Sequence, residues 1–239
     1  VDPEPAAREP PEQQGAAAAD RAGHHDVRGQ RAPVHDQQRG KGNFKIVMDA
    51  FELIRSKGIP VYFVSVITKN NCMKINELLE LARSLDVKLI VQPVFYSEQS
   101  HASNLEGYMD AKYDDKIMME TLDQLIKLKE QGDSTLILSK RYYRNVKESI
   151  RQGRKMICSH GGSLFCTISP DGRVAPCNLL VRDSRWLNGN EIGFRKAFIN
   201  MPEIKCEGCL SSFMDIDDMY SFKIDVAWNY YKQYLKLYT

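Results

Sequence analysis

Residues 61–95, with the sequence VYFVSVITKNNCMKINELLELARSLDVKLIVQPVF, contain two short apolar runs separated by an amphipathic stretch. The runs VYFVSVI (61–67) and KLIVQPVF (88–95) are rich in β-branched residues, which is typical of buried strands. Between them, apolar residues recur at helical spacing from Ile75 to Leu85 and predict a helix. A strand, a helix and a strand in this order predict two parallel strands joined by a right-handed crossover.

Further helices flank this unit on both sides. Apolar residues from Phe44 to Ile54 predict a helix before the first strand. Two more stripes predict a helix over roughly 114–131 and another around 135–152. The fold class is therefore α/β over residues 42–152, but two clear strands are too few for an ordinary sheet or a closed barrel.

The first part of the chain, residues 1–41, differs in composition from the rest. Its first 40 residues contain no Leu, Ile, Phe, Tyr, Trp, Met, Cys or Lys, so they cannot bury enough apolar area to offset their ordering entropy. We expect a disordered leader, either a natural low-complexity tail or a non-native segment from a shifted reading frame or misplaced start. Its histidines, His24, His25 and His35, are too loosely spaced to indicate a metal site.

The bulk composition excludes several classes of protein. A net charge of +2 gives no basic stripe for nucleic acid, and no run of about 18 apolar residues predicts a membrane span. No secretory signal is recognisable. Six cysteines in 239 residues are too few for a disulfide scaffold, so we expect a cytoplasmic protein whose cysteines bind metal.

Four of these cysteines form two pairs within residues 153–239. The segment CSHGGSLFCTISPDGRVAPC begins at Cys158 and ends at Cys177, and its second half predicts a β-hairpin that turns at Pro170–Gly172. The turn would bring Cys177 back beside Cys158.

The second pair lies in KCEGCL (205–210), where Gly208 allows the backbone to fold so that Cys206 and Cys209 face one ion or cluster. Four thiolates are typical of zinc or iron–sulfur sites. Structural zinc stays open, although only one of the two pairs is a tight Cys-x2-Cys. An aromatic stripe near the C-terminus, including Trp228 and Tyr231, predicts a docking face.

The remaining candidates near the cysteine pairs are weaker. Cys166 lies inside the hairpin and is expected to be a buried thiol, with a fifth ligand as the alternative. His160 could be a ligand, but a hydrogen bond to the backbone of its loop is the preferred interpretation. Cys72 is expected to have no metal role.

The spacing Cys158, thirteen residues, Gly172, four residues, Cys177 resembles the opening motif of the SPASM and twitch modules. These modules are C-terminal extensions of radical S-adenosylmethionine (radical SAM) enzymes. The later Cys-x2-Cys is similar to the second half of the motif, and aspartates stand where a full SPASM module has further cysteines. The resemblance therefore implies the shorter twitch form, with one auxiliary 4Fe-4S cluster on Cys158, Cys177, Cys206 and Cys209.

The resemblance extends upstream, because residues 42–97 look like the second half of a radical SAM barrel. It implies the C-terminal half of a partial TIM-like (β/α) barrel, followed by a cysteine-rich hairpin-plus-helix twitch module at 153–239. By analogy, Ser65, Thr68 and Gln92 could face S-adenosylmethionine.

The chain departs from the family at its reactive motif. A Cys-x3-Cys-x2-Cys loop is absent, since only Cys72 precedes Cys158. The resemblance thus implies a fragment of a radical SAM oxidoreductase or maturase, inactive alone, with no catalytic residue identified. Its partners would be the missing N-terminal barrel half, an electron donor such as flavodoxin or ferredoxin, and a substrate that the sequence does not identify. The alternatives are an iron–sulfur electron-transfer or scaffold protein without S-adenosylmethionine chemistry, and a zinc-stabilised α/β protein.

Overall fold

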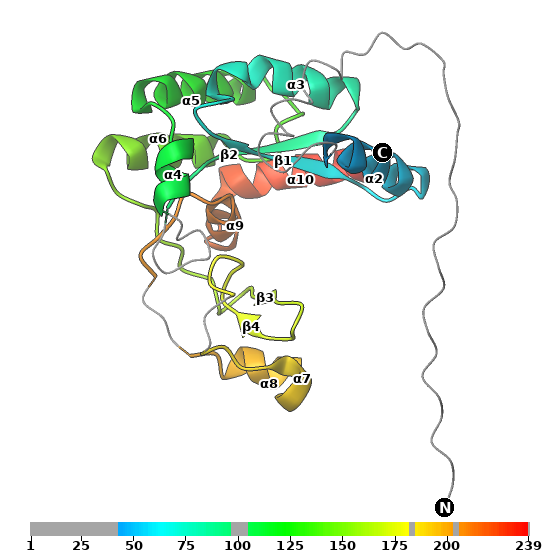
Figure 1. Ribbon diagram of the computed structural model, residues 1–239, viewed down its shortest axis with the longest axis vertical. Helices are drawn as coiled ribbons and strands as arrows, with labels where there is room; N and C mark the ends of the chain where they lie inside the picture. The colour runs from blue at the N-terminus through cyan, green and yellow to red at the C-terminus, as the bar shows by residue number, and fades with distance from the viewer. Residues whose placement is uncertain (1–42, 97–104, 182–184, 203–205, 239) are drawn as a thin grey trace, which may run out of the picture. The chain divides into compact units, whose positions relative to one another are not determined.

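The computed structural model describes residues 43–96, 105–181, 185–202 and 206–238 (Figure 1). The described residues before and after position 49 belong to different units, and each unit is described by itself. The predicted leader, residues 1–41, lies outside the described residues. The elements in chain order are α2 (Asn43–Ser56), β1 (Tyr62–Ile67), the 3-10 turn η1 (Cys72–Lys74), α3 (Ile75–Ser84), β2 (Lys88–Pro93), α4 (Leu105–Ala111), α5 (Asp115–Glu130), α6 (Lys140–Gln152), β3 (Thr167–Ile168), β4 (Val174–Ala175), α7 (Gly189–Ile192), α8 (Phe194–Ile199), α9 (Phe213–Tyr220) and α10 (Ile224–Tyr238).

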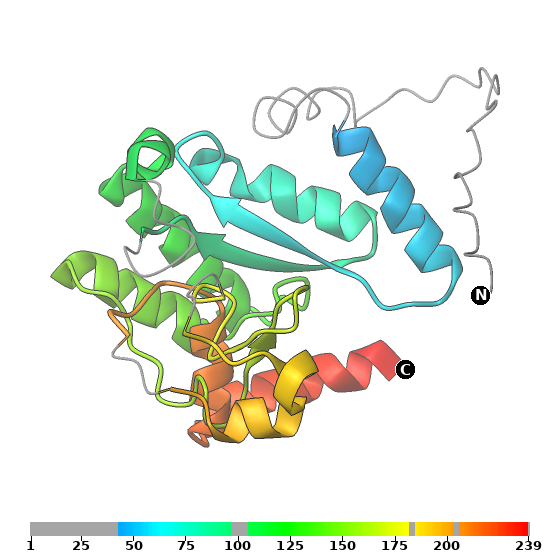
Figure 2. The ribbon, with the colours of Figure 1, turned by 60° about the horizontal axis from the view of Figure 1, so that its bottom comes forward.

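The predicted strand–helix–strand unit is confirmed. Strands β1 and β2 are parallel and in register from the pair Tyr62–Lys88 to the pair Ile67–Pro93, and Figure 2 shows them side by side. Helix α3 connects them, and its buried residues face the strands. The predicted helix over roughly 114–131 is also present as α5, which begins after Asp114, whose side chain accepts the N–H groups of Lys116 and Ile117.

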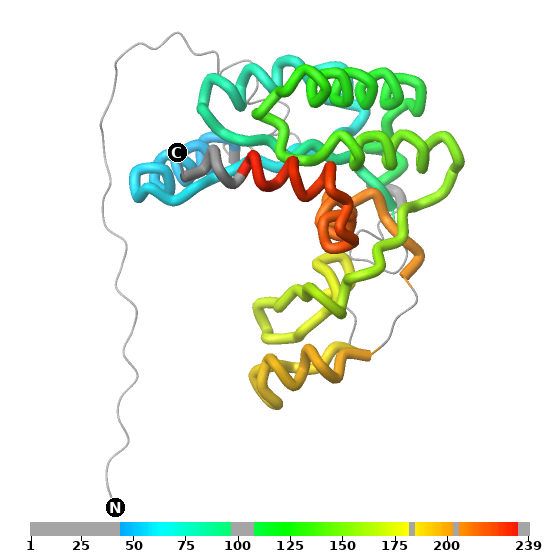
Figure 3. Tube along the Cα trace, turned by 180° about the vertical axis from the view of Figure 1, so that it is seen from behind, coloured from blue at the N-terminus to red at the C-terminus, as the bar shows by residue number. Residues whose placement is uncertain are grey.

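The two faces of this sheet are covered to different extents. On one face Phe63 packs edge-to-face against Phe51 of α2, with ring centroids 5.3 Å apart, and Val91 is fully buried. Helices α3 and α5 lie on one side of the strands and α10 on the other (Figures 1 and 3). On the second face Tyr62, Val64 and Val66 remain 56%, 54% and 41% exposed. An uncovered row of apolar side chains on an edge strand favours association with other chains.

The predicted start of the fourth helix at about residue 135 is wrong. Residues 135–137 instead form a short parallel bridge with β2: the N–H of Leu89 donates to Thr135 O (2.8 Å), and the N–H of Ile137 donates to Leu89 O (3.0 Å). Helix α6 begins only after Ser139, whose hydroxyl accepts the N–H of Tyr142. The apolar residues that suggested a longer helix therefore belong to a third sheet segment.

Side chains close the outer edge of this third segment. Lys129 Nζ donates to Leu136 O (2.9 Å), and two side chains of α10, Gln233 and Asn229, donate to Leu136 O and Ile137 O. These bonds satisfy carbonyls that a further strand would otherwise pair. The described residues thus form an α/β arrangement in which no closed barrel is found. An open parallel sheet is common to many α/β folds, so the half-barrel stays a prediction.

Helix α10 packs through a different face from its aromatic stripe. Val226 is fully buried, whereas Trp228 and Tyr231 are about half exposed and stack on each other with centroids 5.4 Å apart. Helices α9 and α10 both contact α6. The boundary between the predicted domains 42–152 and 153–239 stays a prediction, and the last two helices of the second segment pack back onto the first.

We expect the partly exposed side chains of Tyr62, Val64 and Val66 on β1 to cause self-association. Val64→Lys together with Val66→Lys places charges on exposed positions, so the free energy of unfolding should change by about 1 kcal/mol or less. Oligomer formation, measured by sedimentation velocity over a range of concentrations, should decrease. The control is Ile67→Lys, at a buried position of the same strand, which should unfold the protein. A wild-type chain that is monomeric at every concentration would contradict this expectation.

Candidate metal centre

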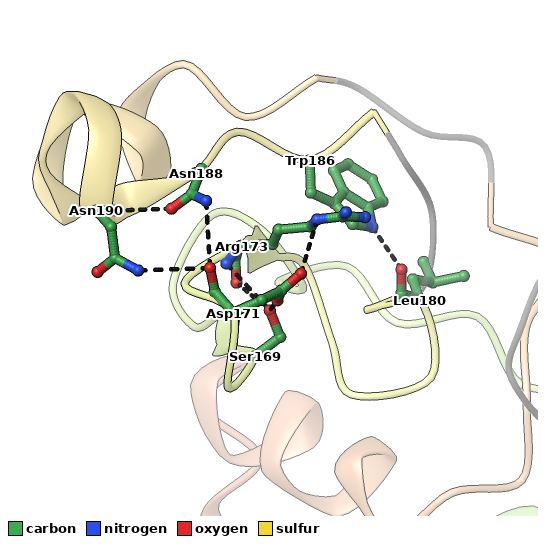
Figure 4. A network of polar contacts seen from close by, with 7 residues as sticks. All are labelled: Ser169, Asp171, Arg173, Leu180, Trp186, Asn188 and Asn190. Carbon is green, nitrogen blue, oxygen red and sulfur yellow. Dashed lines mark hydrogen bonds and ion pairs between the residues drawn. The ribbon is translucent and has the colours of Figure 1, made fainter. Parts of the chain in front are cut away.

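The predicted hairpin is confirmed, and a network of polar contacts fixes its turn (Figure 4). Thr167 pairs with Ala175, and the N–H of Gly172 donates to Ser169 O (2.9 Å). The side chains of Asn188 and Asn190 both donate to the carbonyl of Asp171. These asparagines lie close to the turn, because a Cβ added at Gly172 would be 2.2 Å from Asn190 Nδ2.

Gly172 therefore has two reasons to be glycine: its φ of +88° and the nearby amides. This gives a physical explanation for the glycine in the cysteine–glycine–cysteine spacing. The hairpin rests on a small core of Ala175, Leu180 and Trp186, against which Cys177 packs. The indole N–H of Trp186 donates to Leu180 O and so fixes the loop that follows Cys177.

The loop that follows Cys158 lies against the end of the hairpin. A Cβ added at Gly161 would be 3.2 Å from Cys158 Sγ and 3.4 Å from Pro176 O. Gly162, with φ +83°, approaches the Pro176 side chain equally closely. The hairpin thus returns Cys177 to the neighbourhood of Cys158, as the sequence predicted.

The Cys206–Cys209 loop is joined to the same place by backbone pairing. The N–H of Met156 donates to Cys209 O (3.1 Å), and the N–H of Cys209 donates to Met156 O (2.8 Å). Gly208 has φ +86°, and a Cβ there would be 2.4 Å from Met156 O. Its N–H donates to Cys206 Sγ (3.3 Å). Gly208 therefore allows the tight turn and also the close approach to the chain before Cys158.

The backbone N–H of Gly208 donates to Cys206 Sγ (3.3 Å). Backbone N–H groups also lower the pKa of the other three predicted ligands and so oppose the effect of burial: Gly161 for Cys158, Leu179 and Leu180 for Cys177, and Ser211 for Cys209. N–H groups directed at sulfur stabilise thiolates and tune the potential of a bound cluster. For Cys166, by contrast, burial is the only cause of its raised pKa.

The same four sulfurs lie close enough to affect one another electrostatically. Burial is the largest cause that raises the pKa of Cys209 to about 12, and the charges of Cys206, Cys177 and Cys158 contribute to the same shift. Burial also raises the pKa of Cys158 and of Cys177, and each is affected by Cys206. Several thiolates this close repel one another unless a cation offsets their charge, so metal binding and deprotonation would be coupled.

The thiols are close, but they do not surround a single point. All six cysteines are free of disulfides. Within the described ranges, no three His, Cys, Asp or Glu side chains are already placed to hold one metal ion. A tetrahedral zinc site would need sulfurs about 2.3 Å from one ion, a tighter convergence than this one. The donor set itself, four cysteine sulfurs from neighbouring loops, fits a 4Fe-4S cluster.

His160 contacts a carboxylate. Its Nδ1 lies 3.0 Å from Asp217 Oδ1, and its backbone N–H donates to the same oxygen (2.7 Å). The imidazole also lies beside Tyr220, with centroids 6.3 Å apart. The sequence predicted a backbone partner for His160, whereas the partner is the carboxylate of Asp217.

The three residues predicted to face S-adenosylmethionine are not brought to one face. In the register Ser65 is opposite Val91, on the buried face, whereas Gln92 is opposite Val66, on the uncovered face. Gln92 Oε1 accepts the N–H of Ser212 (2.9 Å), next to the cysteine loop. Thr68 is buried in the turn after β1, where its hydroxyl accepts the N–H of Asn70. Their role in cofactor binding stays a prediction.

Sequence reasoning missed the role of the two aspartates in α9. Asp215 is fully buried and accepts the N–H of Ser139 (2.8 Å), and Asp217 is 5% exposed and accepts the N–H of Ser159 (2.8 Å). A usable signal was present, since Asp215 and Asp217 alternate with apolar residues in a short helix that continues the cysteine loop. Buried carboxylates in such a place need several donors.

Comparisons with known proteins identify no relative: no protein-family model, characterised protein or solved structure matches the chain. In the described part of the chain, every helix is too short or too polar to span a bilayer.

Replacing Gly208 with Ala should move the Cys206–Cys209 loop away from Met156. The added Cβ meets the backbone oxygen of Met156, so we expect a loss of about 3 kcal/mol in unfolding free energy, from a strained φ and a forced shift. The matched control is Gly132→Ala, which has a similar φ of +83° but no atom within 4 Å, and should cost about 1–2 kcal/mol. Urea unfolding of both variants measures the difference, and equal losses would contradict the close approach.

Proposed function

We propose that the chain binds one 4Fe-4S cluster through Cys158, Cys177, Cys206 and Cys209. The observation that carries the proposal is that backbone contacts bring these four cysteines together from three separate stretches of chain. Their sulfurs also lie within electrostatic reach of one another. Cys166 and Cys72 do not share this environment. A cluster bound there would exchange single electrons with a partner or a substrate.

The residues around the cysteines have separate tasks in this proposal. Gly172 and the asparagines hold the hairpin that carries Cys177, and Gly208 holds the loop that carries Cys206 and Cys209. The apolar core at Leu180 and Trp186 limits the access of water to Cys177. Because all four ligands come from the protein, no iron is left open for S-adenosylmethionine.

At the level of the whole protein, we propose the cluster-bearing C-terminal part of a radical SAM oxidoreductase or maturase. Its support is the cysteine–glycine–cysteine spacing, together with parallel strands that precede the cysteines. The missing barrel half, an electron donor such as flavodoxin or ferredoxin, and a substrate would be the partners. Translation of the DNA upstream of this chain in three frames separates this proposal from an electron-transfer or scaffold protein. A Cys-x3-Cys-x2-Cys loop there supports the enzyme, and its absence in every frame contradicts it.

The cluster itself is tested by anaerobic reconstitution. We expect about four irons and four sulfides per chain, because four thiolates complete the ligand set of one cluster. Alanine at Cys158, Cys177, Cys206 or Cys209 should abolish or severely weaken the charge-transfer absorption. Alanine at Cys166 or Cys72 provides the matched controls and should leave it largely intact.

Two outcomes would contradict the assignment. Loss of the cluster in the Cys166 variant, with retention in the Cys158 variant, would show that the ligand set is wrong. One zinc and no iron under anaerobic conditions would favour the zinc-stabilised α/β protein instead. Added S-adenosylmethionine should leave the EPR spectrum of the reduced cluster unchanged, and a changed spectrum would show an open iron.

A further inference from the structure

Asp217 holds the backbone immediately after Cys158. Its Oδ1 accepts the N–H of Ser159 (2.8 Å) and the N–H of His160 (2.7 Å), and lies 3.0 Å from His160 Nδ1. The residue is only 5% exposed and lies on α9, more than fifty positions later in the sequence. Three donors on one oxygen compensate the burial of this carboxylate.

The same carboxylate lies near Cys158, because it accepts the N–H of the residue that follows. Consistent with this position, its negative charge is one of the causes that raise the pKa of Cys158. The loop from Cys158 to Gly162 therefore has two anchors: Pro176 of the hairpin on one side and Asp217 on the other. The anchor at Asp217 carries a charge, whereas the anchor at Pro176 does not.

We propose that Asp217 is a positioning residue for the cluster: its oxygen fixes the turn that presents Cys158, and its negative charge lowers the reduction potential of the bound cluster. This inference rests on the proposed function. A nearby negative charge destabilises the reduced cluster more than the oxidised one, because reduction adds a further negative charge. Substitution can separate the positioning role from the electrostatic role. All three contacts use Oδ1, an atom that asparagine also has, whereas only aspartate carries the charge.

Asp217→Asn retains an Oδ1 acceptor and removes the charge, whereas Asp217→Ala removes both. The matched control is Asp218→Asn, on the same helix, whose Oδ2 accepts from Asn145 instead. The readouts are iron content after anaerobic reconstitution, the midpoint potential from an EPR-monitored redox titration, and amide hydrogen exchange of residues 157–165 in the metal-free chain.

We expect Asp217→Asn to retain full iron content and to have a more positive midpoint potential than wild type. Asp217→Ala should lose most of the iron and show at least tenfold faster exchange at Ser159 and His160. Asp218→Asn should leave this exchange unchanged and should shift the potential less than Asp217→Asn does. Wild-type iron content and wild-type exchange in Asp217→Ala would overturn the positioning role, and an unchanged potential in Asp217→Asn would overturn the electrostatic role.

The design also separates this inference from the proposed function. If the wild-type chain binds no cluster, the proposed function and the electrostatic role both fall. The exchange measurement on metal-free protein still decides whether Asp217 holds the Cys158 loop, because it needs no cluster.

Discussion

Two buried carboxylates on the short helix α9 connect it with the start of α6 and with the loop that follows Cys158. Residues two positions apart on a helix point in nearly opposite directions, so Asp215 and Asp217 bind different segments. Asp215 accepts from the backbone N–H and the hydroxyl of Ser139, at the start of α6. Burial raises the pKa of Asp215, and these hydrogen bonds partly offset the shift. Loss of either carboxylate would leave buried donors unsatisfied and separate α6 or the Cys158 loop from α9.

The cysteine region depends on that connection because its four sulfurs come from three stretches of chain with little regular structure. The hairpin is only two residue pairs long, and the Cys206–Cys209 loop pairs with Met156 through two backbone hydrogen bonds. Small modules of this kind need a covalent or metal staple in addition to their apolar core. A cluster bound by all three stretches would supply one, so metal binding and folding of this region would be coupled.

The sequence was informative where the pattern was local. The two strands at 61–67 and 88–95 and the turn at Pro170–Gly172 follow from residue type and spacing alone. The bridge at 135–137 could not be distinguished from a helix, because a three-residue apolar run has no period. The sequence could have predicted that Ser65 and Gln92 face opposite sides of the sheet, since alternate strand residues do so. It could not have predicted the partners of Asp217, because they depend on a contact between segments far apart in sequence.

The central claim is that Cys158, Cys177, Cys206 and Cys209 enclose one iron–sulfur cluster. Anomalous diffraction at the iron edge, from crystals of the anaerobically reconstituted chain, tests it most directly. We expect one compact group of iron peaks, bonded to these four sulfurs and to no other residue. Iron bound to Cys166, or a single peak that appears only at the zinc edge, would contradict it.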